Sequence, residues 1–180
     1  MRGTIRAIVG AADLNVRQSN MKKANIRDIP QSAKASPKGR FSRAVTDVSI
    51  ALGRKPESTD LKERHPFDVQ ICRIPPGVSR CPYHMHTAQW EYFHVISGAG
   101  TVRHKDGVTE IGKEDVFLFA PEEPHQLINN GSEELVLCIV ADNPIGDTCY
   151  YPDSDKWQLH PRSDKFLKSG TLVDYFDGEE

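Results

Sequence analysis

After Pro66 the chain alternates hydrophobic and polar residues over short segments, with turn-forming residues between them. This pattern is typical of β-strands. The first segment, FDVQICRI, places Phe67, Val69 and Ile71 on one face and stops at the sequence PPG. No helical periodicity separates the segments, so the chain is predicted to be all-β, with no parallel βαβ units. We expect strands over residues 67–74, 90–97, 101–105, 108–112, 115–120, 125–129 and 134–140.

Turn signals refine this prediction. Asp106-Gly107, between two predicted strands, favours a two-residue type I′ hairpin, in which both residues have positive φ. The segment that ends at Ala141 is therefore expected to form a small antiparallel barrel. Residues 142–180 are expected to pack on the barrel. Within them, residues 142–164 are rich in Pro, Asp and Gly, so we expect this part to lack regular structure.

The chain has 180 residues, which suits one domain with tails. We divide it into a basic N-terminal arm (1–43), a barrel core (44–141) and a C-terminal segment (142–180). Through Arg43 there are ten Lys or Arg and two Asp or Glu, whereas the rest of the chain has 13 and 23. No aromatic residue precedes Phe41 to stack on bases, so the arm does not favour nucleic-acid binding. Residues 1–20 show no clear periodicity and are expected to be a loose extension.

Composition excludes several classes of protein. The chain is 38% hydrophobic and 27% charged, as in a soluble globular protein. No apolar run approaches the roughly 20 residues that cross a bilayer, and charges interrupt the N-terminus before a signal-peptide core could form. We therefore expect a cytoplasmic protein with no membrane partner. The four cysteines form no C-x-x-C pair and are expected to be reduced and mostly buried: Cys72, Cys81, Cys138 and Cys149.

Histidines gather in the stretch CPYHMHTAQWEYFHVISGAG, residues 81–100. His84 and His86 are two residues apart, so in an extended segment both imidazoles point to the same side. Glu91 has the wrong parity for one straight strand, but a turn or bulge at residues 87–89 can return it to that face. His125 follows the tight turn PEEP and can reach the same side from another strand.

Three imidazoles and one carboxylate suit one divalent transition metal ion, such as Fe, Mn, Ni or Zn, with one or two open positions. We therefore predict a metal site formed by His84, His86, Glu91 and His125. Parity places His94 on the opposite face from Glu91, so we exclude it. The other histidines are interpreted as structural or surface residues: His65, His104 and His160. Cys81 has the wrong parity relative to His84 and is expected not to bind the metal.

Two groups of residues resemble the motifs of the cupin superfamily. Gly77, His84, His86, Glu91 and Gly98 have the spacing of the first cupin motif; Asp115, His125 and Asn129 resemble the second. Glu114 stands where a glycine usually precedes the aspartate. The resemblance implies a double-stranded β-helix, or jelly-roll, barrel that is usually dimeric and binds a metal through the residues at positions 84, 86, 91 and 125. The flanking sequences are similar to those of small bacterial single-domain cupins.

The cupin resemblance leaves the reaction open, because the superfamily includes dioxygenases, decarboxylases, sugar isomerases and proteins that only bind. A dioxygenase is slightly favoured, since Phe93, Val95 and Leu127 predict an apolar barrel interior that suits a partly hydrophobic substrate. A sugar or sugar-phosphate isomerase would need a cation for the phosphate. Arg73 is the first candidate for it, and Arg80 and Arg103 are weaker ones. A non-catalytic small-molecule sensor is the third alternative.

We also predict a homodimer. In the strand over residues 90–97, Tyr92 and Ile96 point away from the metal face. A strand with apolar side chains on both faces needs a second layer to cover it.

Overall fold

The structure is a computed structural model that describes residues 21–56, 58–158 and 165–180. Its short helical elements are the 3-10 turn η1 (Ile26–Asp28), α1 (Val48–Ala51) and α2 (Leu61–Arg64). Its strands are β1 (Gln31–Ala35), β2 (Ser42–Asp47), β3 (Phe67–Ile74), β4 (Met85–His86), β5 (Glu91–Ser97), β6 (Ala99–His104), β7 (Gly107–Gly112), β8 (Val116–Phe119), β9 (His125–Ile128), β10 (Leu135–Asp142), β11 (Cys149–Tyr151), β12 (Lys156–Gln158), β13 (Lys165–Lys168) and β14 (Thr171–Asp174).

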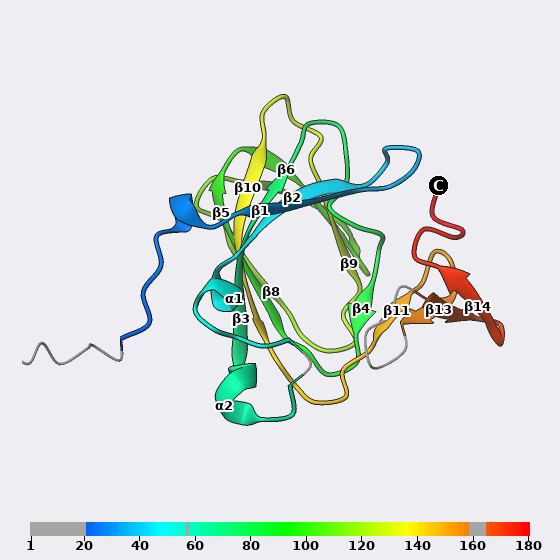
Figure 1. Ribbon diagram of the computed structural model, residues 1–180. Coiled ribbons are helices and arrows are strands. Elements are labelled where there is room, and N and C mark those ends of the chain that lie inside the picture. The colour runs from blue at the N-terminus through cyan, green and yellow to red at the C-terminus, as the bar shows by residue number, and fades with distance from the viewer. Residues whose placement is uncertain (1–20, 57, 159–164) are drawn as a thin grey trace, which may run out of the picture.

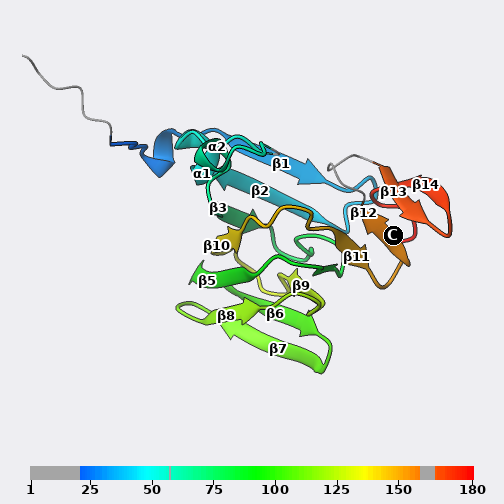
Figure 2. The same ribbon diagram turned by 90° about the horizontal axis from the view of Figure 1, so that it is seen from below.

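These strands form two layers that face each other (Figure 1). One layer is a six-stranded antiparallel sheet in the order β1-β2-β3-β10-β5-β8. The other contains the sheets β7-β6-β9 and β14-β13-β12-β11-β4, which the pair His84 and His125 links through an antiparallel bridge. Figure 2 places β7 and β8 on one side of the molecule and β1 on the other. The arrangement is the predicted double-stranded β-helix, or jelly-roll, fold.

The seven strands predicted from the alternation are all present, within one to two residues at each end. The β6–β7 hairpin also forms, but its turn is not the predicted type I′. Its two loop residues are Lys105 and Asp106, and His104 pairs with Gly107. Gly107 has φ 137°, and Asp106 is not among the described residues with positive φ. The glycine therefore begins β7 instead of completing the turn.

Two positions of the cupin-like motifs show why residue type matters at sharp turns. Gly98 has φ 83°, and a Cβ there would lie 2.4 Å from the carbonyl oxygen of Glu134, so only glycine fits. Glu114 occupies the place of the usual glycine and adopts φ 72°. A non-glycine residue in this region carries a conformational cost of about 1–2 kcal/mol.

The C-terminal segment has more regular structure than expected. It contains the four strands β11 to β14, which extend the second layer. Two of them, β11 and β12, lie within residues 142–164, so the prediction that those residues lack regular structure was wrong. Its small core holds Cys149, Tyr151 and Phe166. Lys156 is fully buried, and its Nζ lies 2.8 Å from Oε1 of Glu179, which fixes the end of the chain. The ion pair and this core explain how a segment rich in Pro, Asp and Gly becomes ordered.

The main core fills the space between the layers. The inward side chains of β5, β9 and β10 are fully buried, among them Phe93, Val95 and Leu127. On β3 the inward positions are Asp68, Gln70 and Cys72, whereas Phe67 and Val69 face outward. The apolar face of FDVQICRI is thus the outer one, and polar residues enter the barrel.

The described residues also bear on the expected organisation of the chain. The expected boundary at residues 43 and 44 falls inside β2, so the later part of the basic arm belongs to the six-stranded sheet. Residues 1–20 and His160 lie outside the described residues. All four cysteines are free, and most of them are buried, as predicted. Only Cys138 is partly buried. Within the described ranges, no helix has the length and apolar character needed to span a membrane.

Candidate metal centre

The pairing of two strands brings His84 and His125 together. The backbone N–H of His125 donates to the carbonyl of His84 at 2.8 Å, and the N–H of His84 donates back at 3.2 Å. Directly opposite residues in an antiparallel pair have neighbouring side chains. Their ring centroids are 4.9 Å apart. Two residues separated by 41 positions in the sequence therefore share one side of the barrel interior.

A turn between β4 and β5 returns Glu91 to the face of His86, as predicted. Asp147 shapes this turn, because its Oδ1 accepts from the backbone N–H groups of Ala88 at 2.9 Å and Gln89 at 3.2 Å. After the turn, Oε2 of Glu91 lies 3.6 Å from Nε2 of His86 and 2.9 Å from Nε2 of His125.

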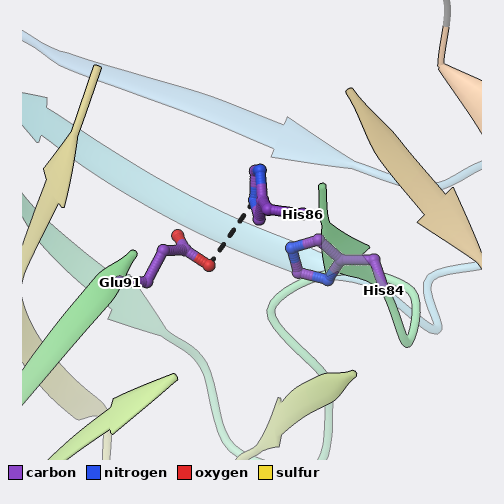
Figure 3. A group of neighbouring side chains, drawn as sticks. All are labelled: His84, His86 and Glu91. Atoms are coloured by element: carbon purple, nitrogen blue, oxygen red, sulfur yellow. Dashed lines mark ion pairs between the residues drawn. The ribbon is translucent and has the colours of Figure 1, made fainter. Parts of the chain in front are cut away.

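Figure 3 shows the side chains of His84, His86 and Glu91 pointing toward one another. One potential ligand atom of each lies within 4.8 Å of the others, a spacing compatible with a metal ion. His125 reaches the same carboxylate from β9. All four side chains are buried, with residue exposures from 1% to 7%. The four residues predicted from the sequence are therefore brought together in the structure.

The outer nitrogen of each imidazole has an oxygen acceptor. Nδ1 of His84 contacts the carbonyl of Pro82 at 3.0 Å, and Nδ1 of His125 contacts that of Glu123 at 3.1 Å. Nδ1 of His86 contacts Oδ2 of Asp147 at 2.7 Å. Carbonyl and carboxylate oxygens only accept, so each Nδ1 carries the proton. A ring that carries only this proton has a lone pair on Nε2, which is the form that binds metals.

Burial and nearby charges set the protonation of the cluster. Burial, together with the charge of His86, lowers the pKa of His84 to about 3. Burial also lowers the pKa of His125. Burial alone would lower the pKa of His86, but its hydrogen bond to Asp147 raises the pKa to about 10. At neutral pH this ring therefore also holds a proton on Nε2, which a metal ion would have to displace. Burial would raise the pKa of Glu91, yet contacts with His125 and His86 hold it well below its usual value. The carboxylate is therefore ionised.

Two atoms at the centre of the cluster lack a hydrogen bond. Oε2 of Glu91 and Nε2 of His125 are enclosed and 2.9 Å apart, but neither has a partner with hydrogen-bond geometry. Unsatisfied polar atoms in a protein interior are costly, and a bound ion is one explanation for them. A cation between the carboxylate and the imidazoles would satisfy both, so the residues present fit a metal ion.

A cavity of about 210 Å³ opens beside His84, His86 and Glu91. Most of its lining is polar and includes several groups that can donate hydrogen bonds. Its cationic and amide side chains are Lys34, Arg43, Arg54, Arg80, Gln70, Gln89, Asn143 and Gln158. This lining differs from the apolar interior expected from the sequence, because Phe93, Val95 and Leu127 pack in the core and do not line the cavity.

Three of the other candidates from the sequence, and the excluded His94, lie outside the cavity. Arg73 points outward, with Nε 3.6 Å from Oε1 of Glu134. Phe93 packs behind the cluster, with its ring centroid 5.6 Å from that of His125. Arg103 pairs with Asp153 at 2.6 Å. His94 is partly exposed and lies 3.6 Å from Glu114, on the opposite face from Glu91 as predicted. Arg80, one of the two weaker candidates for the phosphate-binding cation, does line the cavity.

Sequence reasoning missed several residues around the cluster. Asp147, 61 residues from His86, has no periodic relationship to it that could have revealed the contact. Cys149, opposite His86 on β11, places Sγ 3.5 Å from Nδ1 of His86, and His86, Asp147 and Cys149 form a second group with metal-ligand spacing. Cys81 Sγ lies 3.8 Å from Nδ1 of His84. The sequence does contain a signal for Asp68, because the polar residues of FDVQICRI share one face of the predicted strand.

Comparisons with known proteins agree with this geometry. Residues 70–141 match the model of the cupin domain family. Two solved structures similar to most of the chain are a sugar phosphate isomerase of a cupin superfamily from Silicibacter pomeroyi and a protein from Acidithiobacillus ferrooxidans described provisionally as a sugar phosphate isomerase. The match to the Silicibacter pomeroyi protein has 21% sequence identity and a TM-score of 0.63, and it covers 87% of this chain and 94% of that protein's chain. The match to the Acidithiobacillus ferrooxidans protein has 24% sequence identity and a TM-score of 0.64, and it covers 84% of this chain and 89% of that protein's chain.

A third similar structure is a predicted oxalate decarboxylase from Thermotoga maritima, 16% identical with a TM-score of 0.55, which covers 67% of this chain and 97% of its own. No curated protein matches the sequence. The jelly-roll fold, the cluster of His84, His86 and Glu91, and the family match agree with one another. Residues 70–141 form a cupin domain.

Proposed function

We propose that His84, His86, Glu91 and His125 bind one divalent transition metal ion, and that the protein is a metal-dependent enzyme acting on a small polar molecule. Three imidazoles and one carboxylate suit Fe, Mn, Ni or Zn. The Nδ1 contacts of the three imidazoles, which leave Nε2 as the atom available to a metal, and the two unsatisfied atoms at Glu91 and His125 support this ligand set.

The reaction that the site supports best is the interconversion of an aldose and a ketose, with a sugar or sugar phosphate as substrate. The observation that carries this proposal is the polar lining of the cavity beside the ligands. Amide and guanidinium groups suit hydroxyl and phosphate oxygens, whereas they would leave a hydrophobic substrate facing unsatisfied donors. The similar structures named as sugar phosphate isomerases agree with this choice.

The polar cavity changes the order of the alternatives. A dioxygenase was preferred from the sequence because an apolar interior suited a partly hydrophobic substrate. The side chains behind that preference, Phe93, Val95 and Leu127, are fully buried against one another and their neighbours. The isomerase therefore becomes the better-supported function.

Asp68 is the group on the cavity wall that can accept a proton from the substrate. Its Oδ1 is enclosed and has no hydrogen-bond partner. Its Oδ2 accepts from Nε2 of Gln70 at 3.1 Å and lies 3.5 Å from Nη1 of Arg54, which fixes the carboxylate. Asp68 stands in one row with Ala141 and Glu91 across β3, β10 and β5. Two strand spacings separate it from Glu91, about 10 Å between Cα atoms, which leaves room for a small sugar.

In the proposed reaction, Asp68 removes a proton from the carbon next to the carbonyl group and returns it to the former carbonyl carbon. The proton of the neighbouring hydroxyl group moves to the former carbonyl oxygen, so a ketone replaces the aldehyde. The substrate is only rearranged, so no oxidant or further reactant is needed. A metal ion in the site would polarise the carbonyl oxygen. Arg54 and Gln70 keep the carboxylate of Asp68 oriented toward the cavity.

Aldose and ketose interconversion is tested with the metal-reconstituted protein and a panel of aldoses and their phosphates in D₂O. We expect metal-dependent interconversion with uptake of solvent deuterium at the carbon next to the carbonyl. Oxygen consumption with substrate would support the dioxygenase instead. Ligand binding without turnover of any substrate in either assay would indicate a sensor.

We also propose that the protein forms a homodimer through the outer face of the six-stranded sheet. Four apolar side chains on β5 and β8 are exposed by 37% to 58%: Tyr92, Ile96, Val116 and Leu118. Tyr92 and Leu118 are direct cross-strand neighbours. Exposed apolar side chains at the edge of a sheet favour association with a second copy of the chain.

A further inference from the structure

Three cations from separate segments gather on one wall of the cavity. Lys34 belongs to β1, Arg43 to β2, and Arg80 to the segment between β3 and β4. All three line the cavity beside the metal ligands and also an adjoining cavity against β1 and β2. Figure 2 shows β1 and β2 side by side, with the end of β1 and the start of β2 nearest the C-terminal strands.

Arg80 connects this wall to the metal cluster. Its Nη1 lies 3.8 Å from Sγ of Cys81, which in turn lies 3.8 Å from Nδ1 of His84. One thiol therefore separates the guanidinium from a proposed metal ligand. The Nε of Arg80 is enclosed without a hydrogen-bond partner. Among the ion pairs of the described residues, none joins Arg80 to a carboxylate within 4.0 Å.

The other two cations are held in place beside it. Nη1 of Arg43 donates to the carbonyl of Arg80 at 2.9 Å, which orients the guanidinium. Nζ of Lys34 lies 4.1 Å from the ring centroid of Tyr175, which also lines the cavity. Lys34 and Arg43 are directly opposite in the register of β1 and β2.

Like charges directly opposite each other destabilise a sheet. Asp47 is the one carboxylate that lines the adjoining cavity, so the cations outnumber the acidic groups there three to one. Such an excess is stabilised when an anion binds between the cations. Guanidinium groups match the oxygens of a phosphate in geometry as well as in charge.

We propose that Lys34, Arg43 and Arg80 bind the phosphate group of a phosphorylated sugar. The inference rests on the proposed function of the cavity and specifies its substrate class. With the phosphate on this wall, the sugar carbons extend toward His84, His86 and Glu91. The carbonyl end of the substrate then lies beside the metal ligands.

Inorganic phosphate is the probe for this site, titrated calorimetrically into the full-length, metal-free protein at constant ionic strength. We expect saturable binding that Arg43→Gln and Arg80→Gln each weaken at least tenfold and Lys34→Gln weakens severalfold. Arg73→Gln removes a half-buried arginine outside the cavity and is the matched control, with affinity within twofold of the parent. If Arg80→Gln does not fold, Arg43→Gln and Lys34→Gln decide the result.

Equal phosphate affinity in the parent, Arg43→Gln and Lys34→Gln would overturn the assignment. Acetate that binds as tightly as phosphate would also overturn it, because the site would then recognise a carboxylate. Phosphate binding confined to the metal-loaded protein would place the anion on the metal and not on this wall. Elemental analysis of the same variants separates this inference from the proposed function: phosphate binding by a protein that takes up no metal would support the anion site and contradict the enzyme.

Discussion

Nδ1 of His86 donates to Oδ2 of Asp147 at 2.7 Å, and the same carboxylate holds the turn that leads to Glu91. Asp147 thus orients one proposed metal ligand directly and another through the backbone. A carboxylate behind a ligating histidine fixes the tautomer of the ring and increases its basicity. The contact places Asp147 in a supporting role at the metal site.

Asp147→Ala is expected to lower metal affinity by about 10–100-fold while the protein remains folded. Asp147→Asn keeps an oxygen acceptor, so its effect should be smaller. The measurement is competitive metal titration with a chromophoric chelator. Asp153→Ala, which breaks an exposed pair with Arg103, is the control. Unchanged affinity in Asp147→Ala would show that the contact does not support the metal.

Alternation along the strands predicted much of this site from the sequence. Parity placed His84 and His86 on one side and excluded His94, and the structure agrees for all three. Parity could not say which face of FDVQICRI points inward, because β3 carries apolar residues on its outer face. Arg73 shares that outer face, so its assignment to the substrate depended on the wrong side of the strand. Asp147 and Lys34 reach the site through tertiary contacts that local periodicity does not encode.

The C-terminal strands show a related limit. Irregular structure is predicted for residues 142–164 from their Pro, Asp and Gly content, which is a local property. Their strands pair with β4 and with one another around Tyr151 and Phe166. Burial of these aromatic side chains outweighs the weak intrinsic preference of the segment.

Asp68→Asn tests the proposed proton acceptor. Removing a general base typically costs about 10²–10⁴-fold in rate, so kcat for sugar-phosphate isomerisation should fall by that order. KM should change little and metal content should equal that of the parent, because Asp68 is not a proposed ligand. Steady-state kinetics of Asp68→Asn are compared with those of Asp153→Asn. A variant that retains the full kcat would exclude Asp68 from the proton transfer.

The stability of the metal-free protein should fall in mild acid because of His84. Its folded pKa of about 3 lies below the unfolded value of 6.5, so below pH 6.5 the unfolded chain binds a proton that the folded protein does not. Between pH 7 and pH 5 this residue alone should lower the free energy of unfolding by about 2 kcal/mol. Urea unfolding at both pH values measures the loss.

His84→Gln is the matched variant for this pH dependence, because it removes the titrating group and keeps a polar side chain. Its loss of stability between pH 7 and pH 5 should be smaller than that of the parent by the same amount. His125, Glu91 and Asp147 add to the loss, because their lowered pKa values also favour the folded state at higher pH, whereas the raised pKa of His86 offsets part of it. Identical pH slopes in parent and variant would contradict the burial of a neutral imidazole at position 84.

The proposed dimer is tested by charging its interface. The double substitution Val116→Lys and Leu118→Lys should convert a dimeric parent to a monomer at micromolar concentration, because like charges would face each other across the two copies. Light scattering coupled to size-exclusion chromatography gives the mass. Val108→Lys, at a residue on β7 that is 64% exposed, is the control and should remain dimeric. A monomeric parent, unchanged by removal of residues 1–20, would contradict the interface.

The most direct test of the central claim is elemental analysis of four purified variants beside the parent, after reconstitution with Fe(II), Mn(II), Ni(II) and Zn(II) in turn. His84→Ala, His86→Ala and His125→Ala should each lose a ligand and most of their metal, while circular dichroism shows that they remain folded. His94→Ala should retain nearly full occupancy, because that imidazole lies on the other face near Glu114. Full occupancy in His125→Ala, or a loss in His94→Ala as large as in His84→Ala, would contradict the proposed metal centre.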